Sequence, residues 1–228
     1  MDQGMRIRIT ENGPYIVEGD VPLFEKAIEP KDGGYVWKDV REIPHGEVYA
    51  LCRCGRSKNA PFCDGKSHKR FRGKERADVR PYEERCIVRE GPGIVLQDDE
   101  RCSLSRFCHR AAGKPWALLP GSDDPVLAHE IAMACVECPS GRLTALTKAG
   151  EVLDEECEPA IWIIQDPEKR VSGGIYVRGR IPIIGADGQE YEPRNRAVLC
   201  RCGRSGDMPF CDAAHINSMY RDDRRRPI

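Results

Sequence analysis

The stretch LCRCGRSKNAPFCDGKSH, residues 51–68, returns almost unchanged as LCRCGRSGDMPFCDAAH at residues 199–215. Thiolate and imidazole groups bind soft and borderline metals, and several of them in so short a stretch are typical of a metal site. The sequence therefore predicts two similar metal sites. Their candidate ligands occur in the same order in both copies: Cys52, Cys54, Cys63 and His68, then Cys200, Cys202, Cys211 and His215.

The repeat extends upstream of the cysteines. PYIVEGDVPL at 14–23 is echoed by GIYVRGRIPI at 174–183, an offset of 160 residues, whereas the metal motifs lie 148 residues apart. The first copy therefore carries twelve additional residues between its arm and its motif, and we expect them within residues 27–47. Each repeat should comprise an extended arm, a β-strand (EVYALC or RAVLC) and a Cys/His loop.

The composition excludes several classes of protein. The 228 residues carry 36 Lys and Arg against 37 Asp and Glu, so a general affinity for nucleic acid is not expected. Mean hydropathy is -0.55, and no segment approaches the roughly 18 apolar residues of a membrane span. The N-terminal MDQGMRIRIT lacks the apolar region of a secretory signal. We expect a cytoplasmic protein that binds neither nucleic acid nor membrane.

The twelve cysteines favour metal binding over disulfides. Disulfide frameworks belong mainly to secreted proteins, and here the cysteines cluster at metal-ligand spacing. A two-iron cluster needs two terminal ligands on each iron. The adjacent cysteines of C-x-C can serve one iron, and the later cysteine and histidine can serve the other.

The motif C-x-C-x8-C followed by a histidine resembles the CDGSH iron–sulfur family of the mitoNEET type. The resemblance includes Ser57 and Pro61 in the first copy and Ser205 and Pro209 in the second. It implies a [2Fe–2S] cluster in each repeat, held by three cysteines and one histidine.

Two aspartates also match the family. Asp64 and Asp212 each follow the third cysteine, where the family begins a helix. We expect these carboxylates to cap the helix or to support the ligands through hydrogen bonds, not to bind iron.

The two motifs depart from the family in different ways. The first has one additional residue between Cys63 and His68, so His68 is the ligand whose geometry is in question. The second has Ala213 and Ala214 after its aspartate, where helical alanine should be tolerated. On spacing alone, a Cys3His set is also an ordinary zinc site, so a structural zinc-binding module is an alternative.

The middle of the chain predicts a different unit. CIVRE and GIVLQ predict a hairpin around residues 91–93, SDDP at 122–125 predicts a helix start, and RLTALT and GEVLD predict returning strands. Residues at helical spacing would then share one face of that helix: Leu127, Ile131, Cys135 and Cys138.

Cysteines of this unit form a second metal pattern. Cys102 and Cys108 are separated by five residues, and Cys138 precedes a proline. Bacterial ferredoxins combine C-x2-C-x2-C with a distant C-P, and here Ser105 replaces the middle cysteine. Three thiolates suit a [3Fe–4S] cluster. Cys135 or an external group as fourth ligand would allow a [4Fe–4S] cluster.

The segment 86–146 also resembles the divergent mono-cluster ferredoxin domain that is often joined to tandem CDGSH motifs. The alternative is that its cysteines are small buried hydrophobic residues. Core packing is the role that we expect for Cys86 and Cys157.

The predicted fold class is α+β with three units: an N-terminal CDGSH module at 1–82, a ferredoxin-like α+β insert at 83–154 and a C-terminal CDGSH module at 155–228. Family modules usually pair with exchanged β-strands. The resemblance therefore implies an intramolecular pseudo-dimer, and hence a monomer with internal pseudo-symmetry.

The function implied is one-electron transfer with a redox partner protein, using two [2Fe–2S] clusters and one [3Fe–4S] or [4Fe–4S] cluster. An enzyme is not expected, because the sequence contains no phosphate loop, nucleophile elbow or acid–base constellation. Alternatives are transfer or repair of clusters toward an acceptor protein, and redox sensing.

The run KRFRGKERADVR at 69–80 is strongly basic. Such a run is usually a solvated surface, which is the interpretation that we favour. The alternative is a docking patch for an acidic redox partner.

Overall fold

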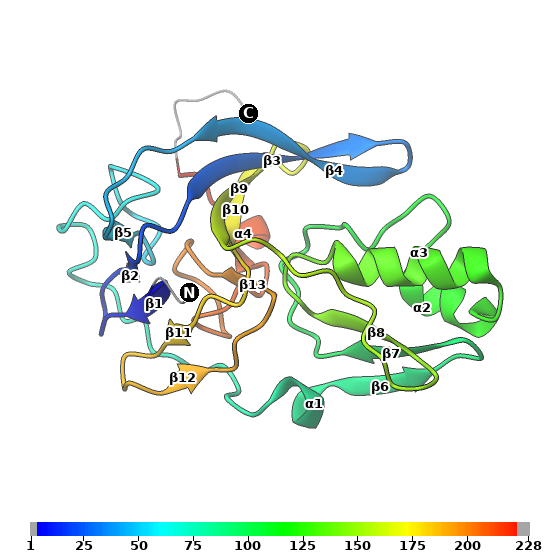
Figure 1. Ribbon diagram of the computed structural model, residues 1–228. Coiled ribbons are helices and arrows are strands. Elements are labelled where there is room, and N and C mark those ends of the chain that lie inside the picture. Colours follow the sequence, from blue (N-terminus) through cyan, green and yellow to red (C-terminus); the bar gives the residue numbers. More distant parts are fainter. Residues whose placement is uncertain (1–3, 223–228) are drawn as a thin grey trace.

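The computed structural model describes residues 4–222, which form three β-sheets and a few short helices (Figure 1). Sheet A has the strand order β12-β11-β1-β2-β5. Its strands, in chain order, are β1 (Arg6–Ile9), β2 (Tyr15–Glu18), β5 (Tyr49–Leu51), β11 (Ile183–Ile184) and β12 (Glu190–Tyr191).

Sheet B has the order β13-β10-β9-β3-β4. Its strands are β3 (Leu23–Lys31), β4 (Gly34–Glu42), β9 (Ala160–Asp166), β10 (Val171–Arg178) and β13 (Arg196–Leu199). The strands predicted from EVYALC and RAVLC are therefore present as β5 and β13.

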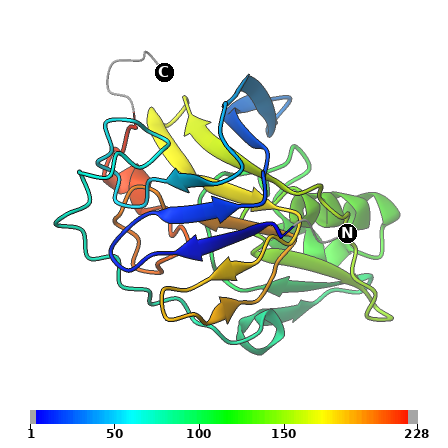
Figure 2. The ribbon, with the colours of Figure 1, turned by 60° about the vertical axis from the view of Figure 1, so that its left-hand side comes forward.

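Each of the two sheets contains strands from both halves of the chain. In sheet A, β1 runs parallel to β11, with Ile7 opposite Ile183. In sheet B, β3 runs parallel to β9, with Leu23 opposite Ile161. Figure 2 shows the blue N-terminal strands side by side with the yellow and orange strands of the second half. Three strands of one repeat are thus completed by two strands of the other in both sheets.

The additional residues of the first repeat lengthen one hairpin. β3 and β4 have nine residues each, whereas the corresponding β11 and β12 have two each. The difference in offset between arm and motif predicted the additional residues in this same region, 27–47.

The main hydrophobic core lies between strands of both repeats. Alternate side chains of β1 and β2 are buried, as expected for strands with one face on the core. β10 is buried along nearly its whole length because both of its faces are covered. The core draws on both halves of the chain, including Ile7, Val17, Leu23, Ile161, Ile175 and Leu199.

The middle unit is a three-stranded antiparallel sheet, β6-β7-β8, with helices packed beside it (Figure 1). The predicted hairpin and helix are confirmed: β6 pairs with β7, and α3 begins at Pro125 with the Asp124 carboxylate accepting the Val126 N–H at 2.8 Å. GEVLD, however, forms only a bridge from Val152 to Leu146 and is not a strand. The strands are β6 (Ile87–Glu90), β7 (Ile94–Asp98) and β8 (Leu143–Thr147).

The helices are all short: α1 (Tyr82–Arg85), α2 (Pro115–Leu118), the 3-10 turn η1 (Leu119–Gly121), α3 (Pro125–Val136) and α4 (Ala214–Asn217). Within residues 4–222, none combines the length and the apolar character that a membrane crossing requires.

Candidate metal centres

Each metal motif begins where a strand ends and folds back on that strand. Leu51, the last residue of β5, bridges Phe62, and the Cys63 N–H donates to the Ala50 carbonyl at 2.8 Å. In the second motif Leu199 bridges Phe210, and the Cys211 N–H donates to Val198 at 2.8 Å. This pairing brings the third cysteine back to the strand end where the C-x-C segment begins, in both copies.

The donor atoms of each motif lie in two pairs. The sulfurs of Cys52 and Cys54 are 3.7 Å apart, and those of Cys200 and Cys202 are 3.6 Å apart. Two thiolates on one tetrahedral metal, with bonds of about 2.3 Å, lie about 3.8 Å apart. The C-x-C pairs therefore match the spacing of two ligands on one metal.

The second pair joins the third cysteine to the histidine. The distance from Sγ to Nδ1 is 3.4 Å both for Cys63 with His68 and for Cys211 with His215. The additional residue of the first motif therefore does not displace His68. Among the residues that the structure describes, no three His, Cys, Asp or Glu side chains are grouped to hold one metal ion. Each motif thus presents two pairs of donors, as two metals with two terminal ligands each would need.

A serine holds each motif loop in shape. The Ser57 hydroxyl donates to the Phe62 carbonyl at 2.6 Å and accepts the Asn59 N–H at 3.0 Å. In the second motif Ser205 makes the same two contacts, with Phe210 and Asp207, at 2.7 and 3.0 Å. These bonds explain why serine is found at this position in both copies.

Asp64 and Asp212 support the loops through backbone N–H groups. Asp64 accepts from Lys58 and Ser67, among others, and Asp212 accepts from Gly206 and Ala214. The Ser67 hydroxyl and these N–H groups hold the pKa of Asp64 well below its usual value. A helix, α4, follows Asp212. The next helix after Asp64 is α1, which begins only at Tyr82, so the expected helix start at Asp64 is wrong.

Ala213 corrects another expectation. It is not helical but has φ of +67°, nearly the same as Gly65 at +69°. The position needs a left-handed residue, which glycine adopts freely and alanine adopts at a cost. The second motif therefore carries a strained residue at the site where the first has glycine.

The two motifs differ in burial. Cys52, Cys54, Cys200 and Cys202 are all buried, but Cys63 and His68 are half-buried, whereas Cys211 and His215 are each only 4% exposed. Burial lowers the pKa of His215 to about 4, which keeps its imidazole in the neutral form that binds metal. Hydrogen bonding from the neighbouring cysteine lowers the pKa of Cys52 and of Cys200, which favours the thiolate.

A buried arginine stands between the two cysteines of each C-x-C. Arg53 donates to the carbonyls of Gly13 and Thr10, both at 3.0 Å, and one of its terminal nitrogens is buried without a hydrogen-bond partner among the described residues. Arg201 donates to two carbonyls in the same way and also forms an ion pair with Asp222 at 2.5 Å.

The two C-x-C segments contact each other directly. A Cβ atom at Gly55 would lie 2.3 Å from the Cys202 carbonyl oxygen, and one at Gly203 would lie 2.6 Å from the Cys54 carbonyl oxygen. Both glycines have positive φ, +70° and +75°. Their packing is reciprocal, and a cavity of about 820 Å³ opens beside the contact.

Further contacts tie the first repeat to the second motif. The buried Tyr15 hydroxyl, on β2, donates to the Cys200 carbonyl at 2.8 Å. The N–H groups of Arg76 and Ala77 donate to the Met208 carbonyl at 2.8 and 2.9 Å. The second motif is therefore held by residues far away in sequence.

Three cysteines of the middle unit, Cys108, Cys135 and Cys138, pack in one apolar cluster. Burial, together with the Cys102 thiol, raises the pKa of Cys138. Burial raises the pKa of Cys108 to about 12, with the two neighbouring thiols adding to the effect. Cys135, on α3, lies in the same apolar cluster as Cys138, and Cys108 packs against that cluster.

Ser105, at the position of the missing cysteine, is buried, and its hydroxyl is hydrogen-bonded to another serine. Its hydroxyl lies 2.9 Å from that of Ser103, which is also 2.9 Å from the hydroxyl of Ser140. The serine therefore completes a small hydroxyl network beside the cysteines.

Cys86 and Cys157 correct the expectation of core packing. Both are half-buried and their thiols point to carbonyl groups, that of Glu83 at 3.7 Å and that of Glu155 at 4.0 Å. Neither residue belongs to an apolar cluster, because each lies on an irregular segment at the edge of the middle unit.

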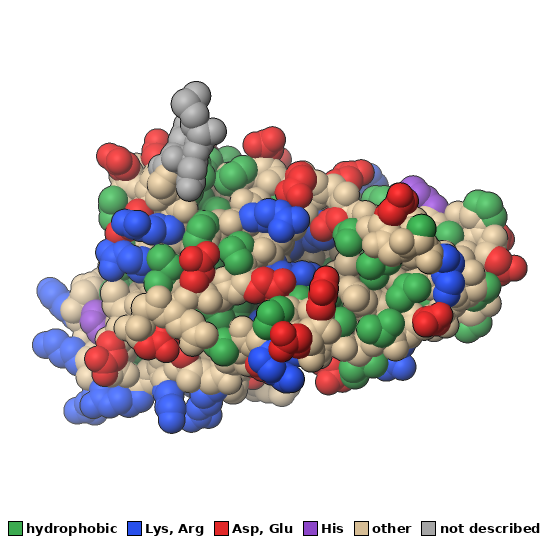
Figure 3. Space-filling view, turned by 60° about the horizontal axis from the view of Figure 1, so that its bottom comes forward, with side chains coloured by type: hydrophobic (Ala, Val, Ile, Leu, Met, Phe, Trp, Pro, Cys, Tyr) green, Lys and Arg blue, Asp and Glu red, His purple; other side chains and the backbone are tan. Residues whose placement is uncertain are grey.

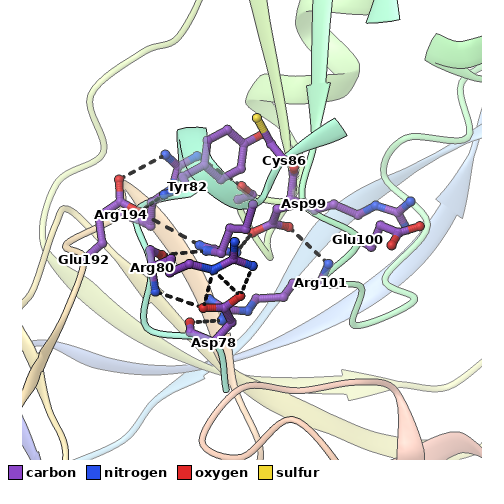
Figure 4. Close-up of polar contacts among 12 residues, drawn as sticks. Asp78, Arg80, Tyr82, Cys86, Asp99, Glu100, Arg101, Glu192 and Arg194 are labelled. Carbon is purple, nitrogen blue, oxygen red and sulfur yellow. Dashed lines mark hydrogen bonds and ion pairs between the residues drawn. The ribbon is translucent and has the colours of Figure 1, made fainter. Parts of the chain in front are cut away.

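A cavity of about 510 Å³ joins the middle unit to the second motif, with Cys102 and Cys211 both in its wall. Arg101 spans the junction: it pairs with Asp207 at 3.2 Å, and its guanidinium carbon lies 4.2 Å from the centre of the Phe210 ring. Figure 4 shows Arg101 among the charged side chains around this junction, which include Asp78, Arg80 and Asp99.

The family comparison agrees with the geometry of the two motifs. The family model "Iron-binding zinc finger CDGSH type" matches residues 12–69 and 172–216. These two matches support a tandem CDGSH protein. Two CDGSH iron-binding domains indicate an iron–sulfur protein, typically of the [2Fe–2S] type. No curated protein and no solved structure was found to match the chain.

The two motifs are supported by residues that sequence reasoning missed. Arg201, Tyr15 and Arg101 each support the second motif through contacts with distant segments. The repeated C-R-C pattern was a signal for Arg53 and Arg201. The sequence held no sign for Tyr15 or Arg101, because their partners lie more than a hundred residues away.

Proposed function

We propose that this tandem CDGSH protein is a multi-cluster one-electron carrier. The observation that carries the proposal is the pairing of donors, which is the same in both motifs: two sulfurs 3.7 or 3.6 Å apart, and a sulfur and an imidazole nitrogen 3.4 Å apart. Two pairs suit a binuclear [2Fe–2S] group better than one zinc ion, which would need four donors in one compact set.

The ligands in the proposal are the three cysteines and the histidine of each motif. A bound cluster would supply a centre that gains and loses one electron. The chain holds the ligands by strand-end backbone bonds and by the Ser57 and Ser205 hydroxyls. It also limits access of water to the second site, where Cys211 and His215 are buried.

We further propose a [3Fe–4S] or [4Fe–4S] cluster in the middle unit, of ferredoxin type. Cys108 packs against the apolar cluster that contains Cys138, and the Cys102 thiol affects the pKa of both, which supports these three cysteines as ligands because a cubane-type cluster takes one thiolate per iron. Cys135, which lies in the same apolar cluster as Cys138, is the candidate for a fourth ligand.

The two CDGSH modules would form an intramolecular pseudo-dimer with exchanged strands. Two features support this proposal: each large sheet has three strands from one repeat and two from the other, and Gly55 and Gly203 pack reciprocally on the opposite motif. A crystal structure with the motifs on separate lobes would overturn it.

A second candidate function, donation of a cluster to an acceptor protein, is favoured by one observation. Cys63 and His68 are half-buried, so the first site is the more accessible. Incubation of the loaded protein with an apo-ferredoxin would show whether the absorbance of a holo-ferredoxin appears.

Anaerobic purification followed by iron and sulfide analysis and EPR spectroscopy tests the proposal. We expect about four irons from the two motifs plus three or four from the middle unit, with matching sulfide. Zinc without sulfide would contradict it. Replacing Cys54 and Cys202 by serine, one at a time, should each remove about two irons. The Cys157→Ser variant is the matched control and should keep them all.

A further inference from the structure

The loop that carries the first metal motif is far more basic than its counterpart. Residues 52–76 contain nine Lys and Arg against two carboxylates, a net charge of +7. The matching residues 200–222 contain three of each and are neutral. Because the whole chain carries -1, the first loop is a positive pole on a molecule whose remainder is negative.

Eight of the nine cations are exposed, and we call them the basic face: Arg56, Lys58, Lys66, Lys69, Arg70, Arg72, Lys74 and Arg76. None of the eight forms an ion pair within residues 4–222. Both carboxylates of the loop are occupied elsewhere: Asp64 accepts N–H groups of its own loop, and Glu75 accepts from the Tyr191 hydroxyl and the Ala186 N–H. The positive charge is therefore uncompensated.

The basic face belongs to the same loop as the more accessible ligands. Lys66 and Lys69 flank His68 in sequence, and His68 and Cys63 are half-buried. The second site is buried and is joined to the middle unit through Arg101. Figure 3 shows Lys and Arg side chains gathered at the end of the molecule opposite the middle unit, which is where Figure 1 places the segment after β5.

We propose that the basic face docks a small acidic electron-carrier protein, which exchanges one electron with the first site. The partner is oxidised or reduced by that electron, and no bond is made or broken. The inference rests on the proposed function and adds the partner class and its location. Opposite charges steer such encounters and speed association about 10- to 1000-fold. Electron-transfer complexes can be weak and small, so a charged patch on the loop of an accessible ligand is sufficient.

Other polyanions fit the surface less well. Single-stranded nucleic acid is bound partly by stacking on aromatic side chains, and the only aromatic residues of the loop, Phe62 and Phe71, are half-buried and buried. Membrane surfaces are bound by apolar side chains beside the cations. None of the exposed large hydrophobic residues of the described chain falls within 52–76.

The test compares two triple variants with the same change in net charge. Lys69→Glu/Arg72→Glu/Lys74→Glu reverses part of the basic face. Lys31→Glu/Lys114→Glu/Lys169→Glu reverses three exposed lysines elsewhere on the surface. Binding of the loaded full-length protein to a plant-type ferredoxin, which is acidic, is measured by calorimetry at low and high salt. Electron exchange is followed by stopped-flow absorbance, with cytochrome c as the basic carrier for comparison.

We expect the basic-face variant to weaken ferredoxin binding and to slow exchange by about tenfold or more at low salt, with a flattened salt dependence. The control variant should change either quantity by less than about threefold. Equal effects of the two variants would overturn the proposal, because only total charge would then matter. Binding to duplex DNA or to anionic phosphatidylserine vesicles without binding to ferredoxin would also overturn it.

The outcome is separate from that of the proposed function. Absence of iron and sulfide from the purified protein would contradict the proposed function. Loaded protein that dithionite reduces, but that neither binds ferredoxin nor responds to the basic-face variant, would overturn the docking site alone.

Discussion

The two metal motifs have the same internal geometry and opposite surroundings. The distances within their donor pairs agree to 0.1 Å. The second motif is buried, uncharged overall and joined to the middle unit, whereas the first has half-buried ligands and a net charge of +7 around it. The local sequence thus repeats a ligand arrangement, and the surroundings give each copy a different degree of access.

The buried arginines show the same contrast. Arg201 has the Asp222 carboxylate as partner, and Asp222 also accepts from the Ser172 hydroxyl and the Gln165 amide. Arg53 has only carbonyl partners for its guanidinium among the described residues, together with the faces of Tyr15 and Phe71. The corresponding arginines of the two motifs are therefore both buried, one with a carboxylate partner and one without.

The largest expected effect is that of Asp222→Ala. It leaves the Arg201 charge buried without its carboxylate, and we expect a loss of about 3–5 kcal/mol in the free energy of unfolding. Urea denaturation of the loaded protein measures it. A loss below about 1 kcal/mol would break the comparison, because Arg201 would then tolerate carbonyl partners alone, as Arg53 does.

The conservative variant Asp222→Asn tests the role of charge through pH. Burial opposes ionisation of Asp222, but Arg201 outweighs it and holds the pKa of Asp222 well below its usual value. The contribution of the carboxylate is therefore complete above the unfolded-state pKa of about 4 and is lost as pH falls further. The difference in stability between wild type and Asp222→Asn should shrink below about pH 4. A constant difference from pH 7 to 3 would contradict this.

The second effect concerns the contact between the motifs. Gly55→Ala and Gly203→Ala should each destabilise the protein by about 2–4 kcal/mol, since the new Cβ would clash with a backbone carbonyl at positive φ. Gly65→Ala is the matched control, with similar φ and no atom within 4 Å of its Cβ, and should cost about 1 kcal/mol. Equal costs at all three positions would show that the motifs do not pack on each other.

The third effect is a difference in the rate of iron loss. The double variant Cys200→Ser/Cys202→Ser retains only the first motif, and Cys52→Ser/Cys54→Ser retains only the second. A ferrous chelator is added to each variant, and the loss of iron is followed by absorbance. We expect the first motif to lose iron about tenfold faster than the second, because its Cys63 and His68 are the more accessible ligands. A tenfold ratio is equivalent to about 1.4 kcal/mol. Faster loss from the second motif would reverse the comparison.

The smallest effect is at the left-handed position of the two motifs. Ala213→Gly relieves the positive φ and should stabilise the protein by about 0.5–1 kcal/mol. Thermal unfolding measures the effect. The variant Gly65→Ala, which makes the opposite exchange at the corresponding position of the first motif, is measured for comparison. Destabilisation by Ala213→Gly would show that packing of the buried Ala213 methyl group outweighs the backbone strain.

Much of the local structure could be predicted because its signals are local. The turn residues 91–93 and the Asp124–Pro125 start of α3 act on their immediate neighbours, and both elements are present. The strand expected from GEVLD is absent, since its only backbone pairing is a single bridge to β8. The helical conformation expected for Ala213 was wrong because the turn into α4 requires positive φ there, which alanine propensity does not reveal.

The sequence alone determined the identity, order and spacing of the candidate metal donors, because a Cys/His loop closes on itself within twenty residues. The tertiary structure decided what surrounds them. Which sheet a strand joins, which carboxylate meets Arg201 and which motif stays accessible all depend on contacts between residues 21 to 194 positions apart. Such contacts form only when both repeats fold together, so two nearly identical stretches of sequence acquire different burial and different charge.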